Sequence, residues 1–261
     1  MKDCREEWFD AANKVAVTIV DVTSAAQELA RGHLAGPTAA HYLTEALASV
    51  ALLGAEMSEK DETVILQAKC SGPLGGYNVE CTAAGTLRGY TEKKILDGFD
   101  GLGKPKDRMV LGDQQVQVTR SVLGRILSQG ISTSLDGYLA GSLQRKACIR
   151  TEVAVSDEVE ILEARGILVE DMPDAKGPMI CCKADGLKSL AVASRNILKQ
   201  LGLENAELRK TTPLKFACRC SPDRAIAMLA ALSEEERKAL PPTIDITCHM
   251  CGRTCTVKVE G

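Results

Sequence analysis

The feature that most constrains this chain is a set of two close cysteine pairs near its C-terminus. Cys218 and Cys220 are separated by one residue, and 27 residues later Cys248 and Cys251 are separated by two. Each pair can bend around one side of a metal ion, and the segment between them can fold so that four sulfurs form a closed tetrahedron, as in structural zinc sites. We predict that Cys218, Cys220, Cys248 and Cys251 bind one zinc ion per chain in the reduced protein.

The segment between the two pairs carries signals of a small folded unit, which argues against chance placement of the cysteines. Ser221-Pro222-Asp223 is typical of a helix start, and Ser233 to Glu236 has the form of a capping box. Residues 243–247 and 254–259 alternate like two short strands beside the second pair. Zinc binding is worth roughly 10–16 kcal/mol, comparable with the whole folding free energy of so small a unit. We therefore expect the unit to unfold when the metal is lost.

Four zinc-bound thiolates are also oxidisable. An oxidant converts a thiolate to a sulfenic acid, which a neighbouring thiol captures as a disulfide, and either pair could react in this way and eject the zinc. The same four cysteines could equally form a permanent staple without redox activity, as in a plain zinc ribbon. Spacing alone leaves both readings open.

Other cysteines and one histidine near the site have simpler interpretations. Cys255 could compete as a ligand or resolve a sulfenic acid, but a buried or strand-facing thiol is the better interpretation. His249 could replace one sulfur, although four cysteines are available without it. Cys181 and Cys182 are read as ordinary thiols rather than a strained vicinal disulfide. The total of eleven cysteines is odd, which excludes a fully paired disulfide framework and favours a reducing compartment.

The first part of the chain predicts an α+β fold, in which an antiparallel-sheet core is packed with helices. Helices are expected from about Thr23 to His33, from Gly36-Pro37 onward, and near residues 135–143. Short segments between glycine-containing turns indicate an antiparallel meander. The expected strands are 15–22, 64–68, 74–81, 86–91, 109–111, 115–119, 148–156 and 160–170.

Two prolines and a glycine interrupt the chain at residues 171–178, where we place the first domain boundary. An amphipathic helix is expected from Asp185 to Leu201, and it needs an apolar surface to lie on. The predicted division is an α+β core domain over residues 1–175, a helical linker over 176–212, and a small zinc-binding domain over 213–261, which is a redox-switch domain if its cysteines are oxidised as described above.

Composition excludes several classes of function. A net charge of −3 gives no long-range attraction for nucleic acid or anionic lipid, and 3% aromatic residues leave little for base stacking. The acidic segment 1–10 lacks the features of a signal peptide, and the longest apolar run is too short to span a bilayer. No nucleophile elbow, P-loop or dinucleotide fingerprint is present. We expect a cytoplasmic protein that is not an enzyme, with an organelle left open, and with neither nucleic acid nor membrane as partner.

Several segments, taken in order, are similar to one known family. They are Glu45 to Leu53, Leu66 to Leu74, Glu80 to Gly89, Gly166 to Val169, and Leu214-Lys-Phe-Ala-Cys-Arg-Cys-Ser221, followed by the second cysteine pair. This series resembles heat-shock protein 33, a redox-regulated holdase chaperone of the stress response. The family arrangement is CxC, about thirty residues, then CxxC, placed after an α+β domain.

The resemblance implies a reduced, zinc-bound form that is inactive as a chaperone. It further implies that Cys248 joins Cys251 on oxidation, then Cys218 joins Cys220, zinc leaves, and the switch and linker unfold. The exposed surface would bind unfolded or aggregation-prone clients without ATP, and a homodimer of the oxidised form is left open. The sequence departs from the family in a shorter linker and at Ser128 to Ile131 and Ser142 to Arg145, which concerns the client-binding surface and not the metal ligands.

Two alternatives stand beside this hypothesis. A zinc ribbon that binds nucleic acid is disfavoured because residues 211–261 carry seven basic against six acidic side chains. A thiol oxidoreductase acting through Cys248 and Cys251 lacks a thioredoxin-like frame around its CxxC motif.

Overall fold

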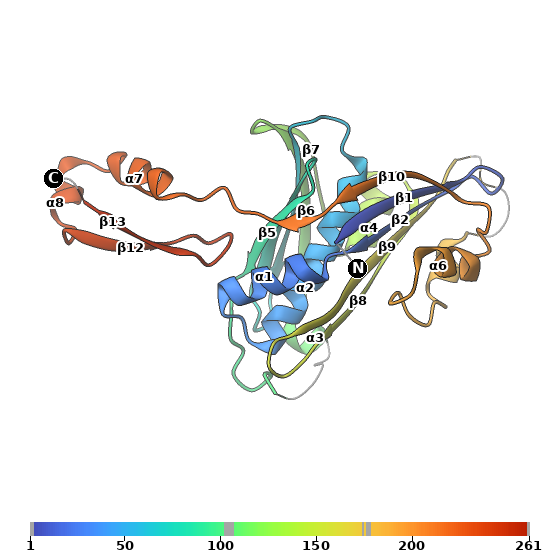
Figure 1. The fold of residues 1–261 in the computed structure, drawn as a ribbon, viewed down its shortest axis with the longest axis horizontal. Coiled ribbons are helices and arrows are strands. Elements are labelled where there is room, and N and C mark those ends of the chain that lie inside the picture. The colour runs from blue at the N-terminus through green and yellow to red at the C-terminus, as the bar shows by residue number, and fades with distance from the viewer. Residues whose placement is uncertain (1–2, 102–106, 174, 176–178, 260–261) are drawn as a thin grey trace.

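The protein is described from a computed structural model, which covers residues 3–101, 107–173, 175 and 179–259 (Figure 1). Most of the chain forms a core of two β-sheets with a helix between them. The helices α7 (Pro222–Ala230) and α8 (Glu234–Lys238) and the hairpin β12 (Thr243–Thr247) and β13 (Thr254–Lys258) project from one side of this core. The α+β fold predicted from the sequence is confirmed.

The first sheet has five antiparallel strands in the order β10-β1-β2-β9-β8. Its strands are β1 (Cys4–Asp10), β2 (Val15–Asp21), β8 (Lys146–Val155), β9 (Ile161–Asp171) and β10 (Glu207–Pro213). The outermost strand β10 comes from the segment that the sequence assigns to the helical linker, so part of that segment belongs to the core sheet. The predicted boundaries between the three parts themselves stay a prediction.

The second sheet has six strands in the order β11-β5-β4-β3-β6-β7. Its strands are β3 (Glu62–Cys70), β4 (Gly76–Thr82), β5 (Thr86–Thr91), β6 (Gln114–Val122), β7 (Arg125–Ser132) and β11 (Lys215–Phe216). The strands β3, β4 and β5 form the predicted meander, and β11 is the one parallel neighbour in this sheet, paired with β5.

The helix α2 (Pro37–Leu53) lies between the two sheets and contacts both. Every residue from Thr38 to Leu53 except Glu45 is buried, because alanines and leucines occupy all sides of the helix rather than one stripe. The helix α1 (Thr23–His33) packs beside α2, and the 3-10 turn Gly54–Glu56 follows α2 along the chain. A helix buried on all faces makes the two sheets and α2 one continuous core.

The linker covers the outer face of the five-stranded sheet. Here α5 (Cys181–Ala184) and α6 (Ser194–Leu201) lie on the side of the core away from the C-terminal hairpin (Figure 1). The apolar side chains at this contact form a second buried cluster. Its members are Trp8, Val15, Val17, Ile19, Ile167, Val169, Ala184, Leu190, Ile197, Leu198, Leu201, Leu203 and Ala206. The expectation that the linker helix lies on an apolar surface of the core is confirmed.

Two local predictions are wrong. Residues 109–111, expected as a strand, fall in the short helix α3 (Asp107–Val110) and its end, where Leu111 N–H donates to Asp107 O at 2.7 Å. The helix expected from Asp185 begins only at Ser194, because the chain before it is bound by side chains of the sheet: Glu152 accepts from Ser189 Oγ at 2.8 Å, and Arg165 donates to Val192 O at 3.1 Å.

Near residues 135–143 the expected helix is present as α4 (Leu135–Gly137) and a π-helical turn over Tyr138–Ser142. None of the helices within the described ranges combines the length and apolar character that a bilayer crossing requires.

Candidate metal centre

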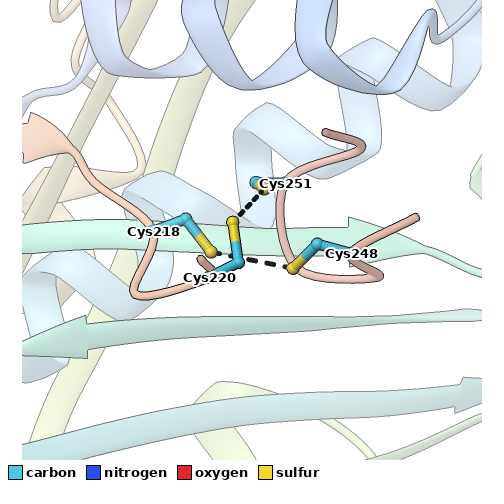
Figure 2. A group of neighbouring side chains, drawn as sticks. All are labelled: Cys218, Cys220, Cys248 and Cys251. Atoms are coloured by element: carbon cyan, nitrogen blue, oxygen red, sulfur yellow. Dashed lines mark hydrogen bonds between the residues drawn. The ribbon is translucent and has the colours of Figure 1, made fainter. Parts of the chain in front are cut away.

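The structure brings the four predicted thiols together. The Sγ atoms of Cys218, Cys220, Cys248 and Cys251 all lie within 4.8 Å of one another (Figure 2). Cys218 is 3.8 Å from Cys248, and Cys220 is 3.4 Å from Cys251. Four sulfurs placed tetrahedrally about zinc at about 2.3 Å would lie about 3.8 Å apart. The donor set therefore fits a tetrahedral thiophilic ion, and only small shifts would be needed to hold one.

Strand pairing with the core places the first cysteine pair. The short strand β11 runs parallel to β5, with Lys215 opposite Thr86 and Phe216 opposite Leu87. Ala217 N–H then donates to Leu87 O at 3.1 Å, so the next residue, Cys218, comes to lie beside Arg88. After Cys220 the chain turns away, because Ser221 Oγ accepts from Arg224 N–H at 3.2 Å and begins α7.

A tight turn at the tip of the β12–β13 hairpin places the second pair. Cys248 N–H donates to Arg253 O at 2.8 Å, and Gly252 N–H donates to Cys248 O at 2.9 Å. Gly252 has φ of 71°, and a Cβ there would lie 2.0 Å from Gly32 O. Both the left-handed backbone and the close approach to α1 require glycine at this position.

The second pair also rests against the core. Gly89 N–H donates to Met250 O at 3.1 Å, while Gly89 O accepts from His33 Nε2 at 2.7 Å. The ring of His249 packs edge-on against Tyr90, with 5.7 Å between centroids. His249 thus contacts the core and is not a member of the four-sulfur group. Strand β5 therefore contacts both halves of the cysteine cluster.

Cys218 differs from Cys220 and Cys251 in how readily its thiol loses the proton. Burial raises the pKa of Cys218, but hydrogen bonds from the Cys220 backbone and the Arg88 guanidinium outweigh burial and bring this pKa down to about 7. Burial is the main cause that raises the pKa of Cys220 and that of Cys251. Without metal, Cys218 becomes a thiolate more readily than Cys220 or Cys251, and thiolates are the form that binds metal and reacts with oxidants.

Among the cysteines whose side chains the structure describes, those outside the four-sulfur group do not join it. Cys255 lies on β13, and its Sγ contacts Ile246 O at 3.6 Å. That contact is consistent with the strand-facing thiol expected from the sequence. The side chains of Cys181 and Cys182 are outside the described part of the structure, so the reading of these two residues stays a prediction.

Two charged residues at the site do not stand out in the sequence. Arg88 Nη1 lies 3.8 Å from Cys218 Sγ, and Glu80 binds both Arg88 and Arg219. Arg88 precedes Cys218 by 130 positions, and only the pairing of β11 with β5 brings the two together. The one available signal is the likeness of segment 80–89 to the family, which does not single out either side chain.

Comparisons with known proteins agree with this geometry. The family described as Hsp33 protein matches residues 7–258. A 33 kDa chaperonin of Thermus thermophilus is 28% identical over 90% of this chain and 78% of its own length. A second, from Oceanobacillus iheyensis, is 26% identical over 96% of this chain and 94% of its own. The crystal structure of the 33 kDa chaperonin (heat shock protein 33 homolog) of Thermotoga maritima has the same fold, with a TM-score of 0.86, 20% identity, and coverage of 99% of this chain and 95% of that one.

Proposed function

Because this chain belongs to the Hsp33 family, whose members are chaperones and not enzymes, we propose that it is a holdase switched on by oxidation. In this proposal Cys218, Cys220, Cys248 and Cys251 hold one zinc ion in the reduced state. Oxidation releases the metal, the C-terminal unit and linker unfold, and the uncovered surface binds unfolding client proteins without ATP in the cytoplasm. Core, linker and switch correspond to residues 1–175, 176–212 and 213–261.

The observation that carries the proposal is the apolar sheet face beneath the linker. Trp8, Val17 and Ile167 on the five-stranded sheet are buried by Ile197 and Leu201 of α6. A surface of this kind, covered by a segment that lies next to the cysteines in sequence, is what a regulated holdase needs. Exposed apolar patches bind other apolar chains, and a covered one does not.

The cysteine unit can control whether the linker stays on the sheet, because only a short stretch of chain joins the linker to the first cysteine pair. The linker runs from α6 into β10, and a single residue, Leu214, separates β10 from β11, which leads directly into Cys218. When zinc is bound it ties the two sulfur pairs together and keeps all four thiols deprotonated. Without that tie, the described part of the unit is held by its hydrogen bonds to β5, by the ion pair of Arg219 with Glu80 on β4, and by a very small apolar core. Its unfolding would therefore reach β10 and the linker.

The order of disulfide formation follows from the family resemblance: Cys248 with Cys251 first, then Cys218 with Cys220. Geometry does not choose between these pairs and others, because all four sulfurs lie within 4.8 Å of one another. A homodimer of the oxidised chain is part of the same proposal.

The test measures zinc and free thiols on one sample of reduced full-length protein. The sample is treated with peroxide, with and without mild heat, and then assayed for suppression of aggregation of a heat-denatured model enzyme. We expect loss of one zinc and four thiols per chain, together with a gain in suppression. Released zinc is read with a chromophoric chelator, and the disulfides are assigned by mass spectrometry of proteolytic fragments.

Two matched variants sharpen this test. Cys251→Ser removes a buried member of the cluster and should abolish tight zinc binding, whereas Cys255→Ser alters a thiol outside it and should bind zinc as the wild type does. Zinc that stays bound through oxidation would indicate a permanent zinc ribbon. Catalytic turnover of a model disulfide by the zinc-free chain would indicate a thiol oxidoreductase. Oxidised, zinc-free protein that leaves aggregation unchanged would refute the holdase.

A further inference from the structure

Arg88 is the core side chain that contacts a sulfur of the cluster. Two of its nitrogens are held by Glu80, at 2.9 Å from Nε to Oε1 and 2.8 Å from Nη2 to Oε2. Glu80 and Arg88 lie directly opposite each other on β4 and β5. With this side of the guanidinium fixed by a bidentate pair, its remaining nitrogen Nη1 is directed to Cys218 Sγ at 3.8 Å.

The charges at this contact are arranged to favour an anionic sulfur. The side chains of Arg88 and Glu80 are 16% and 7% exposed, so water screens their interactions only partly. Glu80 also accepts from Arg219 Nη2 at 2.6 Å. Two guanidinium groups and one carboxylate leave one net positive charge next to the cluster, and four thiolates around a divalent ion carry a formal charge of −2.

We propose that Arg88 is a positioning residue through which the core stabilises the Cys218 thiolate in the metal centre and detects its oxidation. The inference rests on the proposed zinc site and adds to it a residue outside the four cysteines. A hydrogen bond to a ligating sulfur lowers the energy of its donor orbital, strengthens the site, and makes the sulfur a weaker nucleophile toward peroxide.

Oxidation removes the anionic sulfur partner of Arg88 Nη1, while Glu80 stays bound to the other side of the guanidinium. Two thiolates give two electrons to a hydroperoxide: the S–S bond forms, the O–O bond breaks, two protons are taken up, and two molecules of water leave when the oxidant is hydrogen peroxide. A disulfide sulfur is neutral and a poor acceptor, so the part-buried Nη1 donor of Arg88 would lose its acceptor, and the positive charge shared by Arg88, Arg219 and Glu80 would lose the thiolates that balance it. This loss of a hydrogen bond destabilises the region where β11 pairs with β5. Because β11 follows β10 and the linker along the chain, the effect can reach both.

The experiment compares full-length chains loaded with cobalt(II), whose sulfur-to-metal charge-transfer band reports the electron density of the thiolates. Arg88→Gln should move this band to longer wavelength, lower zinc affinity about 10–100-fold in chelator competition, and speed peroxide-driven zinc release. Arg88→Lys keeps the charge but loses the planar guanidinium, which binds Glu80 with two nitrogens and the Cys218 sulfur with the third. This variant should give a smaller shift in the same direction.

The matched control is Arg224→Gln. Arg224 lies on α7 four residues after Cys220, and within the described residues its guanidinium makes no hydrogen bond or ion pair. Removing this charge should leave the band in place and zinc affinity within about twofold of the wild type. Melting temperature is recorded for every variant, and Arg88→Lys must still shift the band if Arg88→Gln does not fold.

Two outcomes overturn the inference in different ways. If both Arg88 variants keep the wild-type band and zinc affinity and only melt earlier, Arg88 is a structural residue and the metal centre stands without it. If the wild-type chain itself binds neither cobalt nor zinc, the proposed metal centre fails and the inference fails with it.

Discussion

At the scale of single residues, the most fully bonded carboxylate in the core is that of Glu62. Its side chain is 0% exposed; it accepts from Arg120 Nε at 2.6 Å and from the backbone N–H groups of Ser58 and Glu59 at 3.0 and 3.3 Å. Burial raises its pKa, but these hydrogen bonds outweigh burial, so its pKa lies below the ordinary value for glutamate. The carboxylate is therefore stabilised in the folded core.

This carboxylate gives the core a defined dependence on pH. A pKa lowered by folding contributes stability above the unfolded value of about 4.3, and that contribution is lost as pH falls through the folded pKa. Glu62→Gln should lower the free energy of unfolding by about 3–5 kcal/mol at pH 7, because Arg120 is left short of a buried partner. Urea denaturation at pH 7 and at progressively lower pH should show the difference from wild type shrinking in acid. A difference that does not change with pH would contradict this account.

Single residues also mark the limit of what the sequence predicts about the site. The four cysteines could be predicted because each pair is close in sequence and its chemistry depends only on spacing. Arg88, Glu80 and Gly32 could not, since each reaches the cluster only through strand or helix packing. A glycine at position 32 has no local reason in the helix, and its reason appears in the fold, where a Cβ would lie 2.6 Å from Cys251 O.

At the scale of elements, α6 is the cover of the five-stranded sheet, and the chain's one tryptophan lies beneath it. The guanidinium of Arg195 stacks over the Trp8 ring at 4.5 Å, and its Nη1 donates to Ala206 O at 2.8 Å. Trp8 is buried, so its fluorescence should change when the linker leaves the sheet. Linker release can thus be followed separately from zinc release.

Weakening α6 should loosen the cover without touching the cysteines. Ile197 is 0% exposed, and Ile197→Ala should destabilise linker packing by about 2–5 kcal/mol through lost burial and a cavity. We expect altered Trp8 fluorescence, faster amide exchange over residues 179–206, and unchanged zinc affinity. The exposed neighbour Lys199→Ala should behave like the wild type. Unchanged exchange in Ile197→Ala would show that α6 does not hold the cover in place.

Elements were predictable where the apolar residues form a continuous run or repeat at helical spacing. The helix α1 buries one face at helical spacing, whereas β2 and α2 were predictable as apolar runs, because β2 is nearly all buried and α2 is buried on every side. Strand β1 escapes prediction because three charged residues in a row, Arg5 to Glu7, hide any apolar alternation, and one of them, Arg5, is buried and donates to Ala51 O. Strand β7 was also missed, because neither of its faces is buried. Its large apolar side chains, such as Ile126 and Ile131, are exposed, so the sequence has no need to alternate apolar and polar residues.

At the scale of the whole molecule, the core and the C-terminal unit differ in what holds them together. Among the described residues after Cys220, only Ala225, Cys251 and Val257 are buried apolar side chains. The core has two sheets packed on α2 and a second cluster under the linker. So small an apolar cluster cannot balance the entropy of ordering the unit, so the metal of the proposed zinc site would be its main source of stability.

Metal removal should therefore unfold one part of the molecule and leave the other. With a strong chelator under reducing conditions, amides in residues 222–258 should lose protection from hydrogen exchange, while those of α2 keep it. Mass spectrometry of proteolytic fragments resolves the two regions in one experiment, and added zinc should restore protection. A C-terminal unit that stays protected without metal would contradict this division of stability.

The overall class could be predicted from the order of strand and helix signals, but the arrangement could not. Nothing local in the sequence says that α2 lies between two sheets, or that residues 207–216 complete both of them. These features depend on strand order across the chain, with β1 paired to β10 and β5 to β11. These paired strands lie far apart in the sequence, so their pairing is decided by packing and leaves no local pattern in the sequence.

That shared segment has one more consequence. Strand β10 is the edge strand of the first sheet, beside β1, and β11 is the edge strand of the second sheet, beside β5. Only Leu214 separates these two strands in the chain, so detaching residues 207–216 would expose the edges of β1 and β5 together. Each edge would present a ladder of free backbone N–H and C=O groups, to which an extended polypeptide can attach whatever its side chains. Detachment of this one segment would thus expose to solvent an apolar surface and, in addition, two sheet edges that can pair with a polypeptide of any sequence.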